Sequence, residues 1–166
     1  MEIAFEVNGT ATTVDVAPDA LFVDILRDHL GLTGVKIGCD STSCGACTVL
    51  LNGLAVKSCT MLAVQLSGAQ IETIEGLAVD GELHPVQAAF SSLHALQCGF
   101  CTPGMIMSAV ALLADQPDPT ANDIRHAIEG NLCRCTGYFN IVRAIEHAGA
   151  VLRGDAPQSG VAEHHN

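Results

Sequence analysis

Eight cysteines in two groups of four are the residues of this chain whose spacing could support chemistry. The first group follows the pattern C-x4-C-x2-C-x11-C, and the second combines C-x2-C with a more distant C-x-C. Thiolate sulfur binds zinc and iron, so each group could hold a metal centre. The first group is Cys39, Cys44, Cys47 and Cys59, and the second is Cys98, Cys101, Cys133 and Cys135.

The first group begins in a loop rich in glycine and serine, with the sequence KIGCDSTSCGACTV. Three cysteines spaced C-x4-C-x2-C and a distant fourth are typical of plant-type 2Fe–2S ferredoxins. One tight loop can present three thiolates, and Gly38 and Gly45 allow its backbone N–H groups to turn toward the sulfurs. Structural zinc sites prefer two C-x2-C-like pairs. The spacing therefore predicts an iron–sulfur cluster, with a zinc knot or four free cysteines as the alternatives.

The second group is less specific by spacing alone. Its C-x2-C pair precedes Pro103, which is expected to open a helix whose partial positive charge favours thiolate. Its C-x-C pair encloses Arg134, a spacing too short for an unstrained disulfide and shorter than that of usual zinc pairs. Side chains two apart diverge on an extended segment, so we expect a turn at Thr136-Gly137 to bring both thiolates together. Zinc stays an alternative, but beside the first group a second iron–sulfur cluster is the more economical interpretation.

Composition argues against several other classes of protein. The chain has 166 residues, is 49% hydrophobic and carries a net charge of −11. Nucleic-acid binding relies on clustered Lys and Arg and often on aromatic platforms, whereas this chain has 7 Lys and Arg, one Tyr and no Trp. The motifs G-x-x-x-x-G-K-S/T, G-x-G-x-x-G and H-E-x-x-H do not occur. We therefore expect no nucleic-acid partner and no catalytic residues apart from the thiol centres.

The N-terminus shows no basic stretch followed by an apolar leader. The longest apolar run, within residues 104–114, is shorter than the ~20 residues that span a bilayer. We expect no transmembrane segment and a cytoplasmic location. Thiols stay reduced there, so eight cysteines indicate metal binding rather than disulfides.

The N-terminal half has the pattern of a small mixed sheet packed on one helix. Alternating apolar residues flank Asn8-Gly9 and Asn52-Gly53, the strongest short signals for β-hairpins. The expected strands cover residues 3–7, 12–16, 48–51, 54–56 and 71–74, and the expected helices cover 20–30 and 60–66.

From residue 77 the apolar pattern changes to a period of 3.6. Pro85 and Pro103 are placed to open helices, and Thr120 with Asp123 forms a capping pattern before a helix that ends at Gly130. One helix is expected to begin near residue 85, and three further helices are expected to cover residues 103–115, 120–130 and 139–153. Four helices joined by short loops predict a bundle.

Four segments together, GCDSTSCGACTVLLNG, VKSCTMLAVQ, QCGFCTPGM and GNLCRCTGY, resemble the small iron–sulfur subunits of the molybdenum hydroxylases. This is the family of xanthine oxidase and aerobic carbon monoxide dehydrogenase. The resemblance covers roughly residues 2–152, and all eight cysteines fall on its motifs. Ferredoxins and zinc proteins do not carry the second set of motifs, so the combination is highly specific.

The resemblance implies an α+β fold in which each of two domains holds one 2Fe–2S cluster. A plant-ferredoxin-like β-grasp domain would cover residues 1–76, a four-helix bundle 77–155, and a polar tail 156–166. The implied role is that of an electron-transfer subunit of an oxidoreductase. Electrons would pass from a molybdenum–pterin centre in a large subunit, through both clusters, to FAD in a medium subunit. The implied assembly is a heterohexamer, a dimer of heterotrimers.

The resemblance also assigns two contacts to the molybdopterin of the large subunit. The glutamine of the family motif QCGxCTPG, here Gln97, contacts the cofactor, and Cys135 lies near it while binding iron. From the residue alone, Gln97 would be a polar side chain at the end of a helix. His94 is expected one helical turn before Cys98, where it could tune that cluster; the alternative is an ordinary surface or core histidine.

The first cysteine loop departs from many family members, which have a glycine between the first two cysteines. This chain has Asp40-Ser41-Thr42-Ser43 there, and loops without this glycine occur among carbon monoxide dehydrogenases and hydroxylases of heterocycles. We therefore expect carbon monoxide or an N-heterocycle as the substrate of the complex. Two alternatives stay open, a free-standing two-cluster electron carrier and an iron–sulfur or zinc redox sensor.

Overall fold

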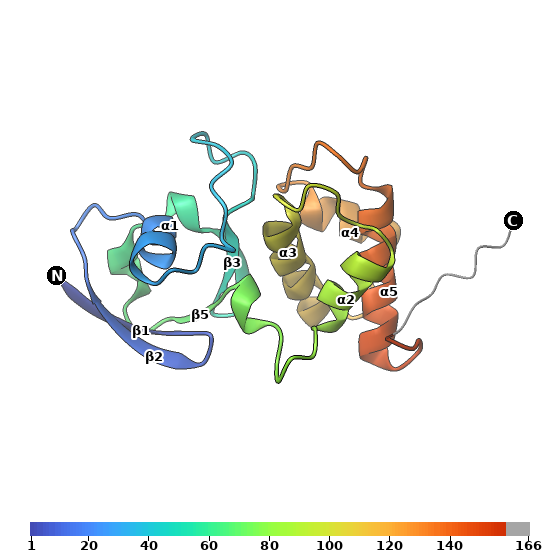
Figure 1. Ribbon diagram of the computed structural model, residues 1–166, viewed down its shortest axis with the longest axis horizontal. Coiled ribbons are helices and arrows are strands. Elements are labelled where there is room, and N and C mark those ends of the chain that lie inside the picture. Colours follow the sequence, from blue (N-terminus) through green and yellow to red (C-terminus); the bar gives the residue numbers. More distant parts are fainter. Residues whose placement is uncertain (159–166) are drawn as a thin grey trace, which may run out of the picture.

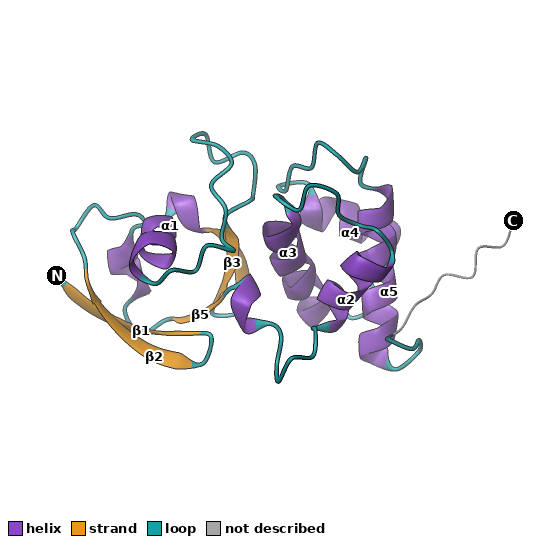
Figure 2. Cartoon of the chain, in the orientation of Figure 1, coloured by secondary structure: helices purple, strands orange, loops and turns teal. Residues whose placement is uncertain are grey.

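Two lobes lie side by side in the structure, which is a computed structural model that describes residues 1–158 (Figure 1). The strands belong to the first lobe, and the second lobe is helical (Figure 2). This is the α+β order expected from the sequence, a sheet domain followed by a helical domain. None of the helices within residues 1–158 has the length and apolar character needed to cross a membrane.

The first lobe is built on a mixed sheet with the strand order β2-β1-β5-β3-β4. Asn8-Gly9 and Asn52-Gly53 form the two hairpin turns, with positive φ at all four residues. The short β5 is parallel to β1 and antiparallel to β3. The strands are β1 (Glu2–Val7), β2 (Thr10–Asp15), β3 (Thr48–Leu51), β4 (Leu54–Lys57) and β5 (Gln70–Glu72).

Helical segments of the first lobe are less regular than the sequence pattern predicts. In place of one helix over residues 20–30, α1 (Phe22–Asp24) continues as a π-helical turn over Ile25–His29. The helix expected over 60–66 is two 3-10 turns, Ser58–Thr60 and Ala63–Leu66. Phe22, Ile25 and Leu26 of this segment are nevertheless buried in the core of the first lobe, whereas Leu21 is 37% exposed.

The second lobe contains four helices around one apolar core. The helix α2 packs on α5, while α4 contacts both α3 and α5. As predicted, Thr120 and Asp123 form a capping box, in which Thr120 Oγ1 accepts from Asp123 N at 3.2 Å. The helices are α2 (Pro85–Ser92), α3 (Thr102–Asp115), α4 (Ala121–Ile128) and α5 (Phe139–Arg153).

The segment after α2 differs from the expectation that the C-x2-C pair ends a helix. The helix α2 ends at Ser92, and His94 has a left-handed backbone with φ 54°. Gln97 and Cys98 consequently lie in an irregular loop rather than at a helix end. The side chain of Asn140 stabilises this loop by donating to the His94 carbonyl at 3.3 Å.

The two lobes share a buried contact. Helix α3 packs against β3, and Leu50 of β3 belongs to the buried cluster of the helical lobe. Of the polar tail expected over residues 156–166, residues 159–166 lie outside the described part of the chain.

Candidate metal centres

The first four cysteines, called here the first thiol set, converge although their sequence separation is large. The β3–β4 hairpin pairs Thr48 with Lys57, and this register places Cys47 opposite Ser58. Ser58 then bonds the Cys47 carbonyl through its N–H at 3.3 Å and its hydroxyl at 2.8 Å. The hairpin thus carries Cys59 back to the loop that holds the other three cysteines.

Within the loop, the Cys44 backbone N–H donates to Cys39 Sγ at 3.4 Å. This hydrogen bond, with smaller contributions from the Cys44 thiol and the Ser41 N–H, lowers the pKa of Cys39 to about 6. Burial, together with the neighbouring Cys47 thiol, raises the pKa of Cys59 to about 11. The loop therefore favours a thiolate at Cys39, while Cys59 must give up a proton when it binds a metal.

The remaining four cysteines, the second thiol set, are gathered by two loops of the helical lobe. Cys98 Sγ lies 3.6 Å from Cys135 Sγ, and the thiols of Cys101 and Cys133 are within hydrogen-bonding contact. The turn expected at Thr136-Gly137 is present, because Thr136 Oγ1 accepts from the Tyr138 N–H at 3.2 Å. That turn allows cysteines only two residues apart to serve one site.

Two thiols of the second set have opposed environments. Burial raises the pKa of Cys101 to about 12, with a further contribution from Cys133. Burial also acts to raise the pKa of Cys133, but hydrogen bonds from the Thr136 hydroxyl and backbone outweigh it, so the pKa of Cys133 is lowered. Thr136 Oγ1 lies 3.1 Å from Cys133 Sγ.

The donor chemistry of both sets fits a 2Fe–2S cluster. In the second set Cys98 Sγ and Cys135 Sγ lie 3.6 Å apart, and elsewhere neighbouring thiols shift one another's pKa, Cys44 that of Cys39, Cys47 that of Cys59 and Cys133 that of Cys101. A tetrahedral metal with bonds of about 2.3 Å to sulfur separates its sulfurs by about 3.8 Å, close to the spacing observed between Cys98 and Cys135. Among the described residues, no three His, Cys, Asp or Glu side chains converge on a single ion position.

The single tyrosine of the chain holds the second thiol set in place. Tyr138 OH accepts from the Cys133 N–H at 2.8 Å and donates to the Asn131 carbonyl at 3.1 Å. Tyr138 itself has a left-handed backbone with φ 67°. Its role escaped the sequence analysis, although its position directly after the C-x-C motif and the turn was a usable signal.

The second thiol set has an outer and an inner edge. Cys98 and Cys135 are exposed, whereas Cys101 and Cys133 are half-buried. Gln97 is also exposed, beside Cys98 in the chain. Large apolar side chains flank the same cysteines in sequence and are exposed too, namely Leu96, Phe100, Leu132 and Phe139. The outer edge therefore presents two thiols and a primary amide.

The inner edge of the second thiol set faces the first. The Leu132 N–H donates to the Cys44 carbonyl at 2.8 Å. A cavity of about 390 Å³ lies at this junction, lined by members of both sets, Cys44, Cys101 and Cys133, and by Phe100, Arg134 and Tyr138 among others. One backbone hydrogen bond thus links a cysteine of one set to the residue preceding a cysteine of the other.

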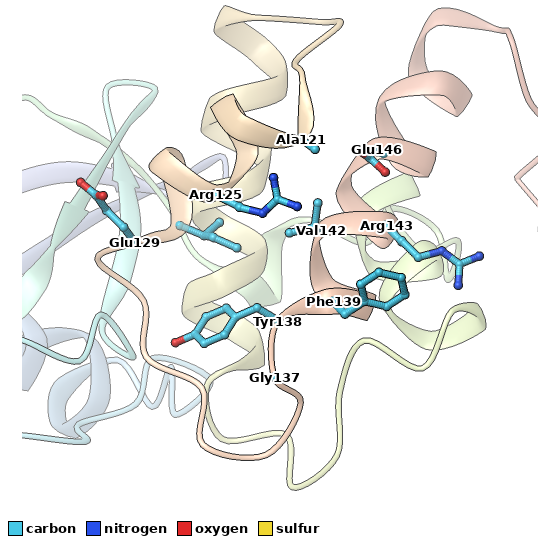
Figure 3. A pocket seen from close by; sticks show the side chains of 10 residues that line it. Ala121, Arg125, Glu129, Gly137, Tyr138, Phe139, Val142, Arg143 and Glu146 are labelled. Carbon is cyan, nitrogen blue, oxygen red and sulfur yellow. The ribbon is translucent and has the colours of Figure 1, made fainter.

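A larger groove, of about 690 Å³, lies between α4 and α5 (Figure 3). Arg125 lines it from α4, Glu129 from the residue that follows α4, and Arg143 from α5. The guanidinium of Arg143 lies 5.8 Å from the centre of the Phe139 ring. Tyr138 lines both this groove and the cavity between the thiol sets.

Two protein-family models match the chain, and they meet near the junction of the lobes. Residues 5–78 match the "2Fe-2S iron-sulfur cluster binding domain", and residues 73–146 match the "[2Fe-2S] binding domain". Fold and sites therefore define a protein with two 2Fe–2S-binding domains.

Similarity to individual proteins identifies the family within this class of 2Fe–2S-binding proteins. The chain is 53% identical over 144 residues to the 6-hydroxypseudooxynicotine dehydrogenase complex subunit beta of Paenarthrobacter nicotinovorans, covering 86% of this chain and 89% of that protein. It is 52% identical over 145 residues to the nicotine 6-hydroxylase small subunit of the same organism, covering 87% of each. The chain belongs to the family of small iron–sulfur subunits of molybdenum hydroxylases.

Solved structures agree with this assignment. Quinoline 2-oxidoreductase from Pseudomonas putida 86 has a chain with a TM-score of 0.88 and 45% identity, covering 94% of this chain and 98% of that one. Aldehyde oxidoreductase from Desulfovibrio gigas gives a TM-score of 0.92 and 43% identity over 95% of this chain, which corresponds to 18% of that longer chain. Members of this family serve as the electron-transfer part of an oxidoreductase complex, and this chain is such a subunit.

Proposed function

We propose that this chain carries electrons from a molybdenum–pterin centre in a large partner subunit to FAD in a medium partner subunit. The ligands would be Cys39, Cys44, Cys47 and Cys59 for the first 2Fe–2S cluster, and Cys98, Cys101, Cys133 and Cys135 for the second. When bound, each cluster supplies a site that accepts and releases one electron at a time. The chain itself supplies the thiolates, their hydrogen bonds and the distance between the two sites.

The pairing of the thiols suggests which cysteines share an iron. In the second set, Cys98 and Cys135 would hold the outer iron, and Cys101 and Cys133 the inner one. The N–H groups around the thiols supply the charge-stabilising contacts that tune such centres. The Cys44 N–H already points at Cys39 Sγ, so this contact is formed without rearrangement.

The observation that carries the proposal is the hydrogen bond from the Leu132 N–H to the Cys44 carbonyl at 2.8 Å. Leu132 is bonded covalently to Cys133, so a path from one thiol set to the other crosses a single hydrogen bond. Two thiol sets joined in this way suit a protein that conducts electrons through itself.

The outer edge of the second thiol set is the proposed contact with the large subunit. Gln97 would bond the molybdopterin through its amide, which can both donate and accept, and Cys135 would lie beside it. Both residues are exposed, as such a contact requires. The exposed side chain of Leu96, next to Gln97 in the chain, would be covered by the partner.

We further propose an N-heteroaromatic substrate for the complex, because nicotine and quinoline appear in the names of similar proteins. The assembly would be a dimer of heterotrimers, located in the cytoplasm, where the eight free cysteines stay available for iron. Within the chain, residues 1–76 would form the β-grasp domain and 77–155 a four-helix bundle, followed by the polar tail.

The test uses the complex purified from its native cell. We predict two distinct 2Fe–2S EPR signals after reduction by quinoline or nicotine, and a weaker response to carbon monoxide or benzaldehyde. Cys135→Ser should abolish or perturb the signal of the second cluster alone, and Cys47→Ser that of the first alone. Loss of the opposite signal would refute the ligand assignment. A colourless chain with stoichiometric zinc, or a stable monomer without molybdenum and flavin subunits, would overturn the proposed function.

A further inference from the structure

Asn131 is a buried polar residue at the contact between the two lobes, with 4% of its surface exposed. Its Nδ2 donates to the Gly45 carbonyl at 3.0 Å and to Thr48 Oγ1 at 3.3 Å, both in the first lobe. Its Oδ1 accepts from Ser108 Oγ of α3 at 2.8 Å. One amide therefore joins the loop of the first thiol set, helix α3, and the segment that leads to Cys133.

The hydrogen bonds around Asn131 permit only one orientation of its amide. The Gly45 carbonyl can only accept, so it must face the Nδ2 group. Thr48 uses its proton to donate to the same carbonyl at 2.7 Å, so its oxygen is left to accept from Nδ2. Ser108 must then donate to Oδ1. Every partner is satisfied, which makes the arrangement rigid and sensitive to the loss of any member.

Backbone segments of the two lobes approach closely around this amide. A Cβ atom on Gly45 would collide with the Gly130 carbonyl and would lie 2.7 Å from Asn131 Nδ2. A Cβ atom on Gly104, at the start of α3, would collide with the Gly45 carbonyl. The first-lobe loop is thus held in a slot between α3 and the 130–131 segment, with no space in which to shift.

We propose that Asn131 is a positioning residue that fixes the separation between the first and the second thiol set. Its side chain holds Gly45, the neighbour of Cys44, and its backbone leads directly into Leu132. The amide therefore secures both ends of the hydrogen bond between Leu132 and Cys44. The distance over which an electron crosses between the lobes is set by this residue, which binds neither cluster.

The test compares Asn131→Asp with the unaltered full-length chain, both loaded with clusters and reduced chemically. The substitution is nearly isosteric, but it places a carboxylate oxygen against the Gly45 carbonyl in a buried site. We expect both cluster signals to persist while the magnetic splitting between the reduced clusters decreases or disappears. Hydrogen exchange of the peptide that contains the Leu132 amide should accelerate in parallel.

Asn122→Asp on α4 is the matched control, since it adds the same charge at an exposed position and should change neither readout. Ser108→Ala frees the Asn131 amide without adding charge, and it should give a smaller change in the same direction. If the Asn131→Asp chain assembles no clusters, the Ser108→Ala chain alone tests the proposal. The proposal would be overturned if Ser108→Ala, and Asn131→Asp where it assembles clusters, showed the magnetic splitting and the hydrogen exchange of the unaltered chain.

This role presupposes the electron-transfer function proposed above, but the readouts do not use partner subunits. A chain that no molybdenum subunit reduces would contradict the proposed function while leaving the splitting measurable. Unchanged splitting in a chain that its partner does reduce would contradict the role of Asn131 alone.

Discussion

At the scale of single residues, the second thiol set depends on side chains that bind no metal. Tyr138 OH satisfies the Cys133 N–H and the Asn131 carbonyl together, which ties the start of the C-x-C segment to the start of α5. A left-handed backbone is unusual for an aromatic residue and is retained when surrounding contacts favour it. The hydroxyl of Tyr138 is therefore a structural support for Cys133.

Tyr138→Phe removes both of these hydrogen bonds while keeping the ring. Because the Cys133 N–H is left without its partner, we predict a loss of stability of about 1–3 kcal/mol. The second cluster should also shift in reduction potential, while the first keeps its own. Redox titration followed by EPR measures the potentials, and loss of cluster absorbance in urea measures the stability. Ser92→Ala on α2 is the control hydroxyl deletion, and equal effects of the two substitutions would contradict the support role.

At the scale of elements, features with a local cause were predictable from sequence. Asn-Gly pairs gave both hairpins, and Pro85 and Pro103 marked the starts of α2 and α3. The end of α2 was not predictable, because Leu93 and Leu96 continue the apolar period although the helix stops at Ser92. Tertiary contacts decide such ends, as the bond from Asn140 to His94 illustrates.

The start of α2 has a cap that the sequence pattern did not reveal. His84 Nδ1 accepts from the Val86 N–H at 3.2 Å, and Gln87 Oε1 accepts from the His84 N–H at 3.0 Å. Burial lowers the pKa of His84 below its ordinary value of 6.5, against a smaller opposing effect of Glu72. The neutral imidazole is thus the form that caps the helix, since protonation of Nδ1 would remove the acceptor.

The unfolded chain therefore takes up this proton more readily than the folded one. The stability that His84 contributes is complete above pH 6.5 and is lost as the pH falls through 6.5 toward the lower pKa of the folded state. We predict that His84→Asn, which can cap without titrating in this range, removes this part of the pH dependence. Urea unfolding of both proteins at pH 7.5 and 5.5 measures the change in the free energy of unfolding with pH. An equal fall in stability in the two proteins would rule out His84 as the source.

At the scale of the whole molecule, the site depends on contacts between residues far apart in sequence. All eight cysteines could be assigned to two sets from their spacing, and the structure brings each set together. The join between the sets could not be predicted, since Asn131 and Gly45 are 86 residues apart and neither lies in a recognisable pairing pattern. Leu50, in the strand β3, likewise completes the core of the other lobe.

The groove between α4 and α5, which Phe139 lines, gives the last prediction, which concerns assembly. Phe139 is 69% exposed at the start of α5, four residues after Cys135, and an aromatic side chain so placed suits a buried anchor in a subunit interface. We predict that Phe139→Ser weakens binding of the large subunit by about 2 kcal/mol or more, roughly 30-fold, while both cluster signals persist. Co-purification and titration of the separated subunits measure the binding. Leu54→Ser is the control, because Leu54 is 71% exposed on β4 of the other lobe and should leave this contact unchanged. If the two substitutions weaken binding equally, or neither does, the large subunit meets another face of the chain.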